Sequence, residues 1–241
     1  MTFDWARGRH PELLSGRYYR PLDEAVPHQF FATSMLVSPL LMGTFGWEPD
    51  APHRRARLAP QLPPHWEHTT VRNLRVGESS VDAEFEQGAG RFVATLAARG
   101  PAITLELAIP IPPGARDVRS SLPGESRTEE LYVVSVQLSQ TPSRIELEWT
   151  GGLQVEPPTV PLQPGQPSQG LRILDYRYAR GRWVALVEGT AGRTYAVRFH
   201  GEAISRVDGA EVVRRDGPVT TIAVTIPTGS ERETVEIVIY R

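Results

Sequence analysis

The sequence contains no cysteine and no lysine, and each absence excludes a class of chemistry. Without cysteine the chain has no disulfide, no thiolate nucleophile, no iron–sulfur cluster and no cysteine zinc site. Without lysine it has no phosphate-binding loop of the Walker-A type, no Schiff-base lysine and no Ser-x-x-Lys nucleophile. All 26 basic residues are therefore arginine, a bias that fits genomic base composition better than function.

Long apolar runs and a strong net charge are also missing. No apolar run approaches the roughly 18 residues of a membrane span, and residues 1–20 lack the apolar core of a secretory signal peptide. The formal net charge of −2 gives no electrostatic case for nucleic acid or for an anionic membrane surface. We expect neither partner, no cofactor and no metal ion. The compartment stays open, with the cytoplasm favoured.

Apolar and polar residues alternate along most of the chain after Asp50. The stretches Ile103–Ile109, Ile145–Trp149 and Val235–Ile239 are examples, and this alternation is typical of half-buried antiparallel strands. Turn signals such as Asp208-Gly209 separate the stretches at intervals of roughly ten residues, as in sandwiches. The sequence therefore predicts a mainly β fold of one or two antiparallel β-sandwich units, within the one or two domains that 241 residues allow.

One segment interrupts the β pattern. Nine of the 20 residues of Gly151–Gly170 are proline or glycine, so the segment is expected not to lie inside a sheet. It is either a linker between two β units or an extended strap across one. We place a first unit at residues 51–156 and a second unit, or a continuation of one sandwich, at 157–241. A faint repeat between Val81–Ala94 and Leu174–Ala185 favours two units.

Residues 1–50 predict a loop followed by a single apolar helix. The helix is expected over residues 27–46, with Pro27 at its first turn and a kink or end at Pro39. It is apolar on nearly all sides, and the sequence predicts no second helix to cover it. Because a large exposed apolar face normally marks an interface, self-association through this helix is one expectation.

The loop before the helix is the most polar part of the chain. Residues 9–29 combine carboxylates, histidines, tyrosines and arginines, the groups with which proteins bind and hydrolyse carbohydrate. A simpler interpretation is a solvated loop in which Asp23 and Glu24 complement the dipole of the following helix. Composition alone favours the simpler interpretation.

The order of short motifs over about residues 8–125 adds a family resemblance. Pro11-Glu12-Leu13, Val26-Pro27-His28-Gln29, Leu62-Pro63-Pro64-His65-Trp66 and Val71–Gly77 follow one another as in the last part of bacterial debranching-type glycoside hydrolases. These are amylo-α-1,6-glucosidase-like enzymes with six helical hairpins in an (α/α)6 barrel. The resemblance implies that residues 1–50 are a loop plus the last barrel-type helix, followed by a C-terminal β-sandwich.

The same resemblance implies roles for individual residues. Glu12 becomes a candidate general base that activates water for inverting hydrolysis. The substrate-binding candidates are His28 and Gln29 from the resemblance, together with Tyr18, Tyr19 and Arg20 of the same loop. Inverting hydrolysis needs a second carboxyl group about 6.5–9.5 Å away, and the barrel that would supply it is absent from this chain.

These observations lead to one expected function and one alternative. The chain is expected to be the C-terminal portion of a glycoside hydrolase acting on α-glucan-like carbohydrate, inactive alone and partnered by the missing barrel portion. Whether it counts as an enzyme stays open. The alternative is a non-catalytic β-sandwich module that binds carbohydrate or protein.

Overall fold

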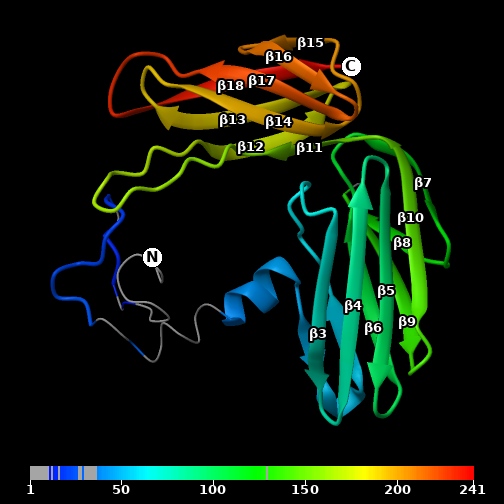
Figure 1. The fold of residues 1–241 in the computed structure, drawn as a ribbon. Helices are drawn as coiled ribbons and strands as arrows, with labels where there is room; N and C mark the ends of the chain where they lie inside the picture. The colour runs from blue at the N-terminus through cyan, green and yellow to red at the C-terminus, as the bar shows by residue number, and fades with distance from the viewer. Residues whose placement is uncertain (1–10, 12, 16, 27–28, 30–36, 129) are drawn as a thin grey trace.

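The computed structural model describes residues 11, 13–15, 17–26, 29, 37–128 and 130–241. Their fold is mainly β, and the strands form two sandwiches, each with its own pair of sheets (Figure 1). The fold class predicted from the alternating pattern is thus confirmed. Within this described part, no helix is both long enough and apolar enough to cross a membrane.

The first sandwich consists of two five-stranded sheets. One has the order β1-β2-β6-β9-β8, with the bounds Glu48–Asp50, Arg55–Leu58, Ile103–Pro110, Leu131–Leu138 and Glu125–Thr128. The other has the order β3-β4-β5-β10-β7, with the bounds His68–Val76, Ser79–Gly88, Arg91–Arg99, Ser143–Gly151 and Ala115–Ser120. Neighbouring strands in both sheets are antiparallel, apart from β2 and β6, which run parallel.

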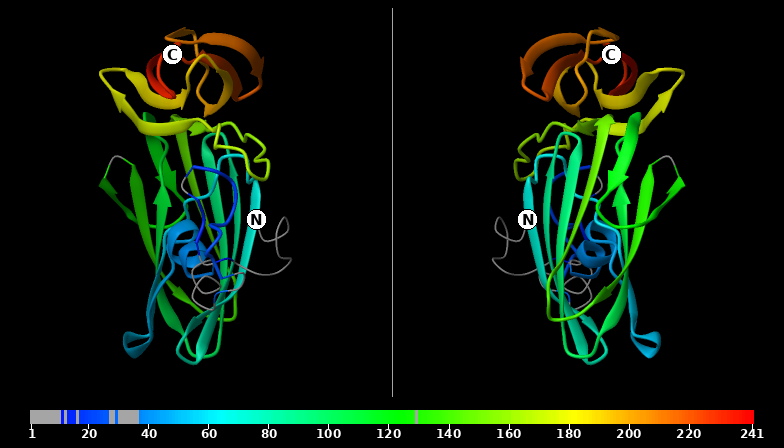
Figure 2. Two further views of the ribbon diagram at one scale, coloured as in Figure 1. Left: turned by 90° about the vertical axis from the view of Figure 1, so that its left-hand side faces the viewer. Right: turned by 90° about the vertical axis from the view of Figure 1, so that its right-hand side faces the viewer.

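The second sandwich consists of two four-stranded antiparallel sheets. One has the order β11-β14-β17-β16, with the bounds Leu153–Glu156, Thr194–Gly201, Val219–Thr225 and Glu211–Asp216. The other has the order β12-β13-β18-β15, with the bounds Arg172–Ala179, Arg182–Thr190, Arg232–Tyr240 and Arg206–Asp208. This sandwich lies across one end of the first, so that its strands run crosswise to those below (Figures 1 and 2).

Each sandwich has a separate apolar core. Ile145, Leu147 and Trp149 of β10 point into the first core, and Trp183 is fully buried in the second. The period-2 pattern places such residues on one face of each strand, where burial stabilises by about 1.5–3 kcal/mol for a large apolar side chain. Corresponding hairpins, β4–β5 and β12–β13, each bring two aromatic rings together, at 5.7 Å and 4.9 Å between centroids. These are the two segments of the faint sequence repeat.

The chain passes from one sandwich to the other through a single residue, Gly152. Strand β10 of the first sandwich ends at Gly151, and β11 of the second begins at Leu153. Gly151 and Gly152 both have positive φ angles, +66° and +77°, which glycine adopts without strain. The first unit was expected to end at Glu156. Residues 153–156 instead form β11, which pairs with β14, so they belong to the second sandwich.

The expected apolar helix is described only in its second half. Residues 37–44 are helical, and from Leu40 to Thr44 the helix widens to a π-turn in which the Phe45 N–H donates to the Leu40 carbonyl at 3.3 Å. Pro39 lacks an N–H donor and directly precedes this change, but its own backbone is helical and the helix continues past it, so the predicted end at Pro39 is wrong and a kink there stays a prediction. Leu41, Phe45 and Trp47 pack against the first core. Residues 27–28 and 30–36 lie outside the described part.

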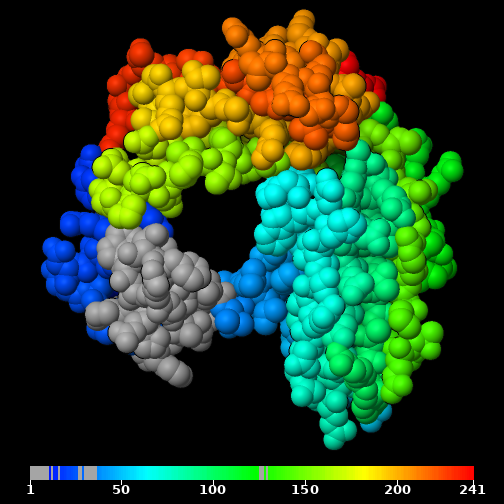
Figure 3. Space-filling view, viewed as in Figure 1, coloured from blue at the N-terminus to red at the C-terminus, as the bar shows by residue number. Residues whose placement is uncertain are grey.

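Residues 13–26, which we call the arm, connect to the proline-rich residues 157–170, which we call the strap. The arm folds back on itself through the Leu14–Pro21 bridge, and Tyr18 bridges to Pro167. The Tyr19 N–H donates to the Gln166 carbonyl at 2.8 Å, and the Gly165 N–H donates to the Tyr19 carbonyl at 3.0 Å. Figure 3 shows the arm in blue against the strap, both standing apart from the first sandwich. The strap thus holds the arm.

Candidate functional site

The structure describes four of the six residues predicted to form a sugar site. Glu12 and His28 lie outside the described residues, so the position of the candidate base stays a prediction. Tyr18 and Arg20 are exposed on the arm, while Tyr19 and Gln29 are half-buried. The structure therefore brings Tyr18, Tyr19 and Arg20 together on one short turn.

Tyr18 is surrounded by the arginines of its own arm. The guanidinium carbons of Arg17 and Arg20 lie 5.6 Å and 6.0 Å from the centre of its ring, within the range of a cation–π contact. Arg20 also lies 3.8 Å from the carboxylate of Asp23, and Arg17 donates to Glu231 of the second sandwich at 2.9 Å. These contacts stiffen the arm and place two charged groups where a sugar would have to stack on the ring.

A polar groove lies at the junction of the two sandwiches, a place that the sequence did not predict. Its volume is about 480 Å³, within the usual range of ligand sites, about 300–1,000 Å³. The first sandwich contributes Pro64, His65 and Glu67, the turn around Gly88 and Trp149. The second sandwich contributes Gln154 of β11, Arg198 and His200 of β14, and Val219.

Strand register explains why polar side chains face this groove. In the β11–β14 pair, Gln154 lies opposite His200 and Glu156 lies opposite Arg198. Side chains alternate across a strand, so these four share one face of the sheet, while Leu153 and its neighbours on the other face pack in the second core. A polar ladder thus points from the second sandwich toward the first.

Glu156 is the centre of this ladder. Its side chain is only 4% exposed, yet it meets partners from both sandwiches. Its Oε2 accepts a hydrogen bond from His200 Nε2 at 2.6 Å, and its Oε1 contacts the Arg198 guanidinium. His65 Nδ1 of the first sandwich lies 3.4 Å from the same Oε1. A buried carboxylate is costly unless paired, and these three partners offset that cost and fix the orientations of the surrounding rings.

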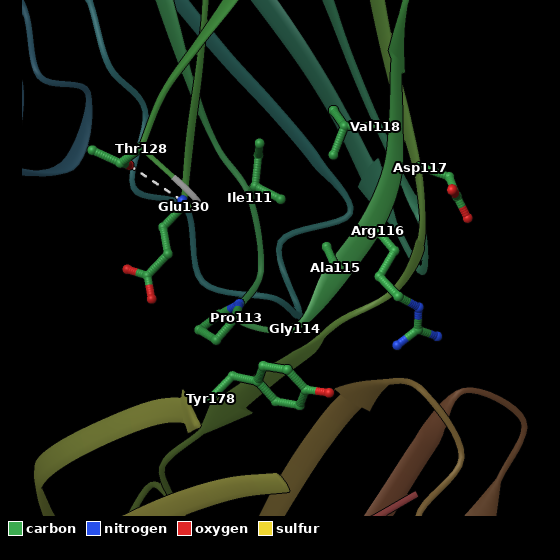
Figure 4. A pocket seen from close by; sticks show the side chains of 10 residues that line it. All are labelled: Ile111, Pro113, Gly114, Ala115, Arg116, Asp117, Val118, Thr128, Glu130 and Tyr178. Atoms are coloured by element: carbon green, nitrogen blue, oxygen red, sulfur yellow. Dashed lines mark hydrogen bonds between the residues drawn. The ribbon is translucent and has the colours of Figure 1, made fainter. Parts of the chain in front are cut away.

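A second cavity of about 540 Å³ opens on another side of the junction. Figure 4 shows Ile111 and Val118 deep in it, Glu130 on one side, Arg116 and Asp117 on the other, and Tyr178 below. Two of the three charged residues that line it have side-chain partners, since Arg116 donates to Glu202 at 3.1 Å and Asp117 accepts from Thr150 at 2.8 Å. The hydrogen bond that Arg116 donates to Glu202 raises the pKa of Arg116. This cavity is the weaker candidate for a ligand site.

Metal chemistry finds no support in the described part of the chain. Across those residues, no group of three histidine, aspartate or glutamate side chains is arranged to hold a metal ion. Trp149 and Trp183 are buried, so neither offers a free face for sugar stacking. Trp66 is exposed and lies beside His65 at the groove, with the two rings 6.4 Å apart in an edge-on arrangement.

Sequence reasoning missed the groove residues for a definite reason. Only the β14 half of the ladder was predicted as an alternating stretch, whereas residues 153–156 fell in the segment that was expected not to lie inside a sheet. The pairing of the two halves joins strands about 40 residues apart, and such a register depends on tertiary packing. Comparison with known proteins adds no further constraint: the chain matches no family model, no curated protein and no solved structure.

Proposed function

We propose that this chain is the accessory β-sandwich portion of a debranching-type glycoside hydrolase acting on α-glucan-like carbohydrate. In this proposal the arm and the apolar helix dock on a helical catalytic barrel, while the two sandwiches brace them. The chain alone turns over no substrate. The proposal rests on the motif resemblance and on one structural observation, the distribution of exposed apolar side chains.

That distribution is strongly uneven. Of the twelve large apolar side chains that are exposed among the described residues, eight lie within residues 13–42: Leu13, Leu14, Tyr18, Leu22, Val26, Val37, Leu40 and Met42. Met42 is 66% exposed and Val37 is 56% exposed. Scattered apolar residues are normal on a surface, but a concentration of this kind marks an interaction surface. A helical barrel would bury it.

The surface is held in place rather than left as a free tail. The arm is bonded to the strap at residues 165–167, and Leu41, Phe45 and Trp47 anchor the end of the helix in the first core. Pre-organised surfaces lose less conformational entropy when they bind. This arrangement supports docking as the function of residues 13–47.

The proposal also assigns the missing acid to the partner. Among the described residues, Asp23 is the carboxylate closest in sequence to Glu12. Its side chain is 86% exposed and lies 3.8 Å from that of Arg20. A general acid has to be held opposite the base across the scissile bond, and the exposed Asp23 side chain lines neither of the cavities described above. We therefore assign the base to Glu12 and the acid to the barrel.

The test combines a binding and an activity measurement. The chain is mixed with a six-hairpin barrel polypeptide of the debranching class from the same genome, and complex formation is followed by sedimentation. Release of glucose from 1,6-branched malto-oligosaccharides is measured in parallel. We expect a complex with activity, no activity from the chain alone, and binding weakened about tenfold or more by Met42→Asp.

Val213→Asp is the matched control, because Val213 is similarly exposed, at 57%, but lies on β16 far from the arm in sequence. Two results would contradict the proposal. One is hydrolysis by the chain alone that disappears in Glu12→Gln. The other is equal binding by the Met42 and Val213 variants.

A further inference from the structure

The groove between the sandwiches has the properties of a binding site rather than of a packing defect. Its polar wall is built around Glu156, a carboxylate that is almost fully buried and paired from both sides of the junction. Such an arrangement is costly to desolvate, so well-packed apolar residues would hold the sandwiches together equally well. Its effect is to fix the rings of His65 and His200 at the edge of an open space.

The chemistry of the walls indicates which ligand fits. Gln154, Glu67 and the two histidines offer amide, carboxylate and imidazole groups, which between them donate and accept hydrogen bonds. Pro64, Pro112 and Pro218 supply apolar C–H surfaces beside these polar groups. A ligand that matches both needs many hydroxyl groups and apolar ring faces.

The charge balance argues against an anion. The carboxylates of Glu67 and Glu156 lie in or directly behind the groove, and Arg198 is the one arginine among the residues that line it. Arg198 is itself engaged by Glu156. Sites for phosphate or sulfate concentrate arginines or backbone N–H groups instead.

We propose that this groove binds a neutral oligosaccharide. None of the residues that line the groove belongs to residues 1–50, and the inference goes beyond the docking function. It stands on the groove alone, so it holds whether or not the arm binds a barrel. Gln154 and Glu67 would bond ligand hydroxyl groups, with the prolines against the sugar rings.

The experiment measures binding of three trisaccharides to the full chain by isothermal titration calorimetry. The probes are maltotriose, isomaltotriose and cellotriose, with inorganic phosphate as the anionic comparison. We expect saturable binding of at least one trisaccharide and none of phosphate. Gln154→Ala should weaken that binding by about 2- to 10-fold, the effect of one lost hydrogen bond, whereas Gln163→Ala on the exposed strap should leave it unchanged.

A second pair of variants tests the place of binding. A Cβ added at Gly88 meets no atom within 4 Å, and the backbone there needs no positive φ. Gly88→Trp should therefore fill the groove without disturbing β4, and abolish binding. Gly170→Trp is the control, because its Cβ would meet only the Ser168 hydroxyl at 3.9 Å, away from the groove.

Three results would overturn the inference: no trisaccharide binds, binding survives Gly88→Trp in a protein that keeps its near-ultraviolet circular dichroism, or phosphate binds in preference. Failure of the docking function would give a different result: the chain and its Met42→Asp variant would bind the barrel equally, while the trisaccharide titrations would be unchanged.

Discussion

The indole Nε1 of Trp183 donates a hydrogen bond of 2.6 Å to the carbonyl of Pro113, and this bond joins the two sandwiches. Trp183 belongs to β13 of the second sandwich, and Pro113 to the β6–β7 loop of the first. The indole is fully buried, so its N–H cannot exchange this partner for water. The junction is therefore a specific contact with its own free energy.

Trp183→Phe should test that free energy. The variant keeps an aromatic ring in the second core but removes one of the two donors to the Pro113 carbonyl, which also accepts from the Leu153 N–H at 3.2 Å. We expect a loss of about 0.5–1.5 kcal/mol, the net contribution of one hydrogen bond. Urea unfolding should show this loss. Trp149→Phe is the matched control, because the Trp149 indole makes no hydrogen bond among the described residues and the variant removes only packing area. Equal losses in both variants would refute the role of the bond.

Gly114→Ala should loosen the same junction. Gly114 has φ +83°, and an added Cβ would lie 2.9 Å from the rings of Trp183 and Tyr178. Gly181→Ala is the control, because its φ of +80° imposes the same backbone strain while its Cβ meets no atom within 4 Å. We expect Gly181→Ala to lose about 1–2 kcal/mol and Gly114→Ala to lose a further 1–3 kcal/mol or so from overpacking. Urea unfolding separates the two.

Glu156→Gln should destabilise the chain although it hardly changes the shape of the side chain. The amide keeps the shape of the carboxylate but cannot neutralise Arg198 or accept the same charge-assisted hydrogen bond from His200. Because Arg198 is half-exposed and solvent screens it, we expect a loss of about 1–3 kcal/mol in unfolding free energy rather than the larger cost of a fully buried pair. Glu211→Gln, on an exposed strand position, should change stability by less than about 0.5 kcal/mol.

Glu188 should make stability depend on acid pH. The hydrogen bond from Arg232 at 2.8 Å, together with Arg172, holds the pKa of the Glu188 carboxyl below its ordinary value in the folded chain. A lowered folded pKa gives stabilisation that is present above the ordinary carboxyl value, about 4.3, and is lost as the pH falls through the lowered folded value. The difference in urea midpoint between wild type and Glu188→Gln should therefore be largest near neutral pH and disappear in acid.

The pH series has an internal comparison. Arg232 also donates to the Gly170 carbonyl at the end of the strap, so Arg232→Gln should lose the acid-dependent difference and a pH-independent part as well. A midpoint difference for Glu188→Gln that persists in acid would contradict the assignment.

The fold class could be predicted because local patterns determine it. Stretches such as Ile145–Trp149 and Val235–Ile239 carry the period-2 alternation that a half-buried strand needs, and both form strands at those positions. The single apolar helix was also predicted, although the described part is shorter than the expected 27–46.

The groove could not be predicted because it depends on contacts between distant segments. Nothing local shows that Glu156 would pair with Arg198 across two strands, or that His65 of a proline-rich loop would approach the same carboxylate. Residues 157–170 illustrate the same limit. Their composition excludes the interior of a sheet, but it does not decide between a linker joining two units and an extended segment lying across one. Only the bonds to Tyr19 show that they hold the arm.

The step through Gly152 between β10 and β11 leaves almost no tether length between the sandwiches. The two sandwiches cannot separate and re-associate as domains joined by a flexible linker do. Any reorientation therefore has to break the Trp183–Pro113 and Arg116–Glu202 hydrogen bonds while β10 and β11 stay in place. A pulling force applied at the C-terminus would consequently reach the first sandwich directly. The two sandwiches are expected to respond to force as one stiff unit until the contacts at their junction break.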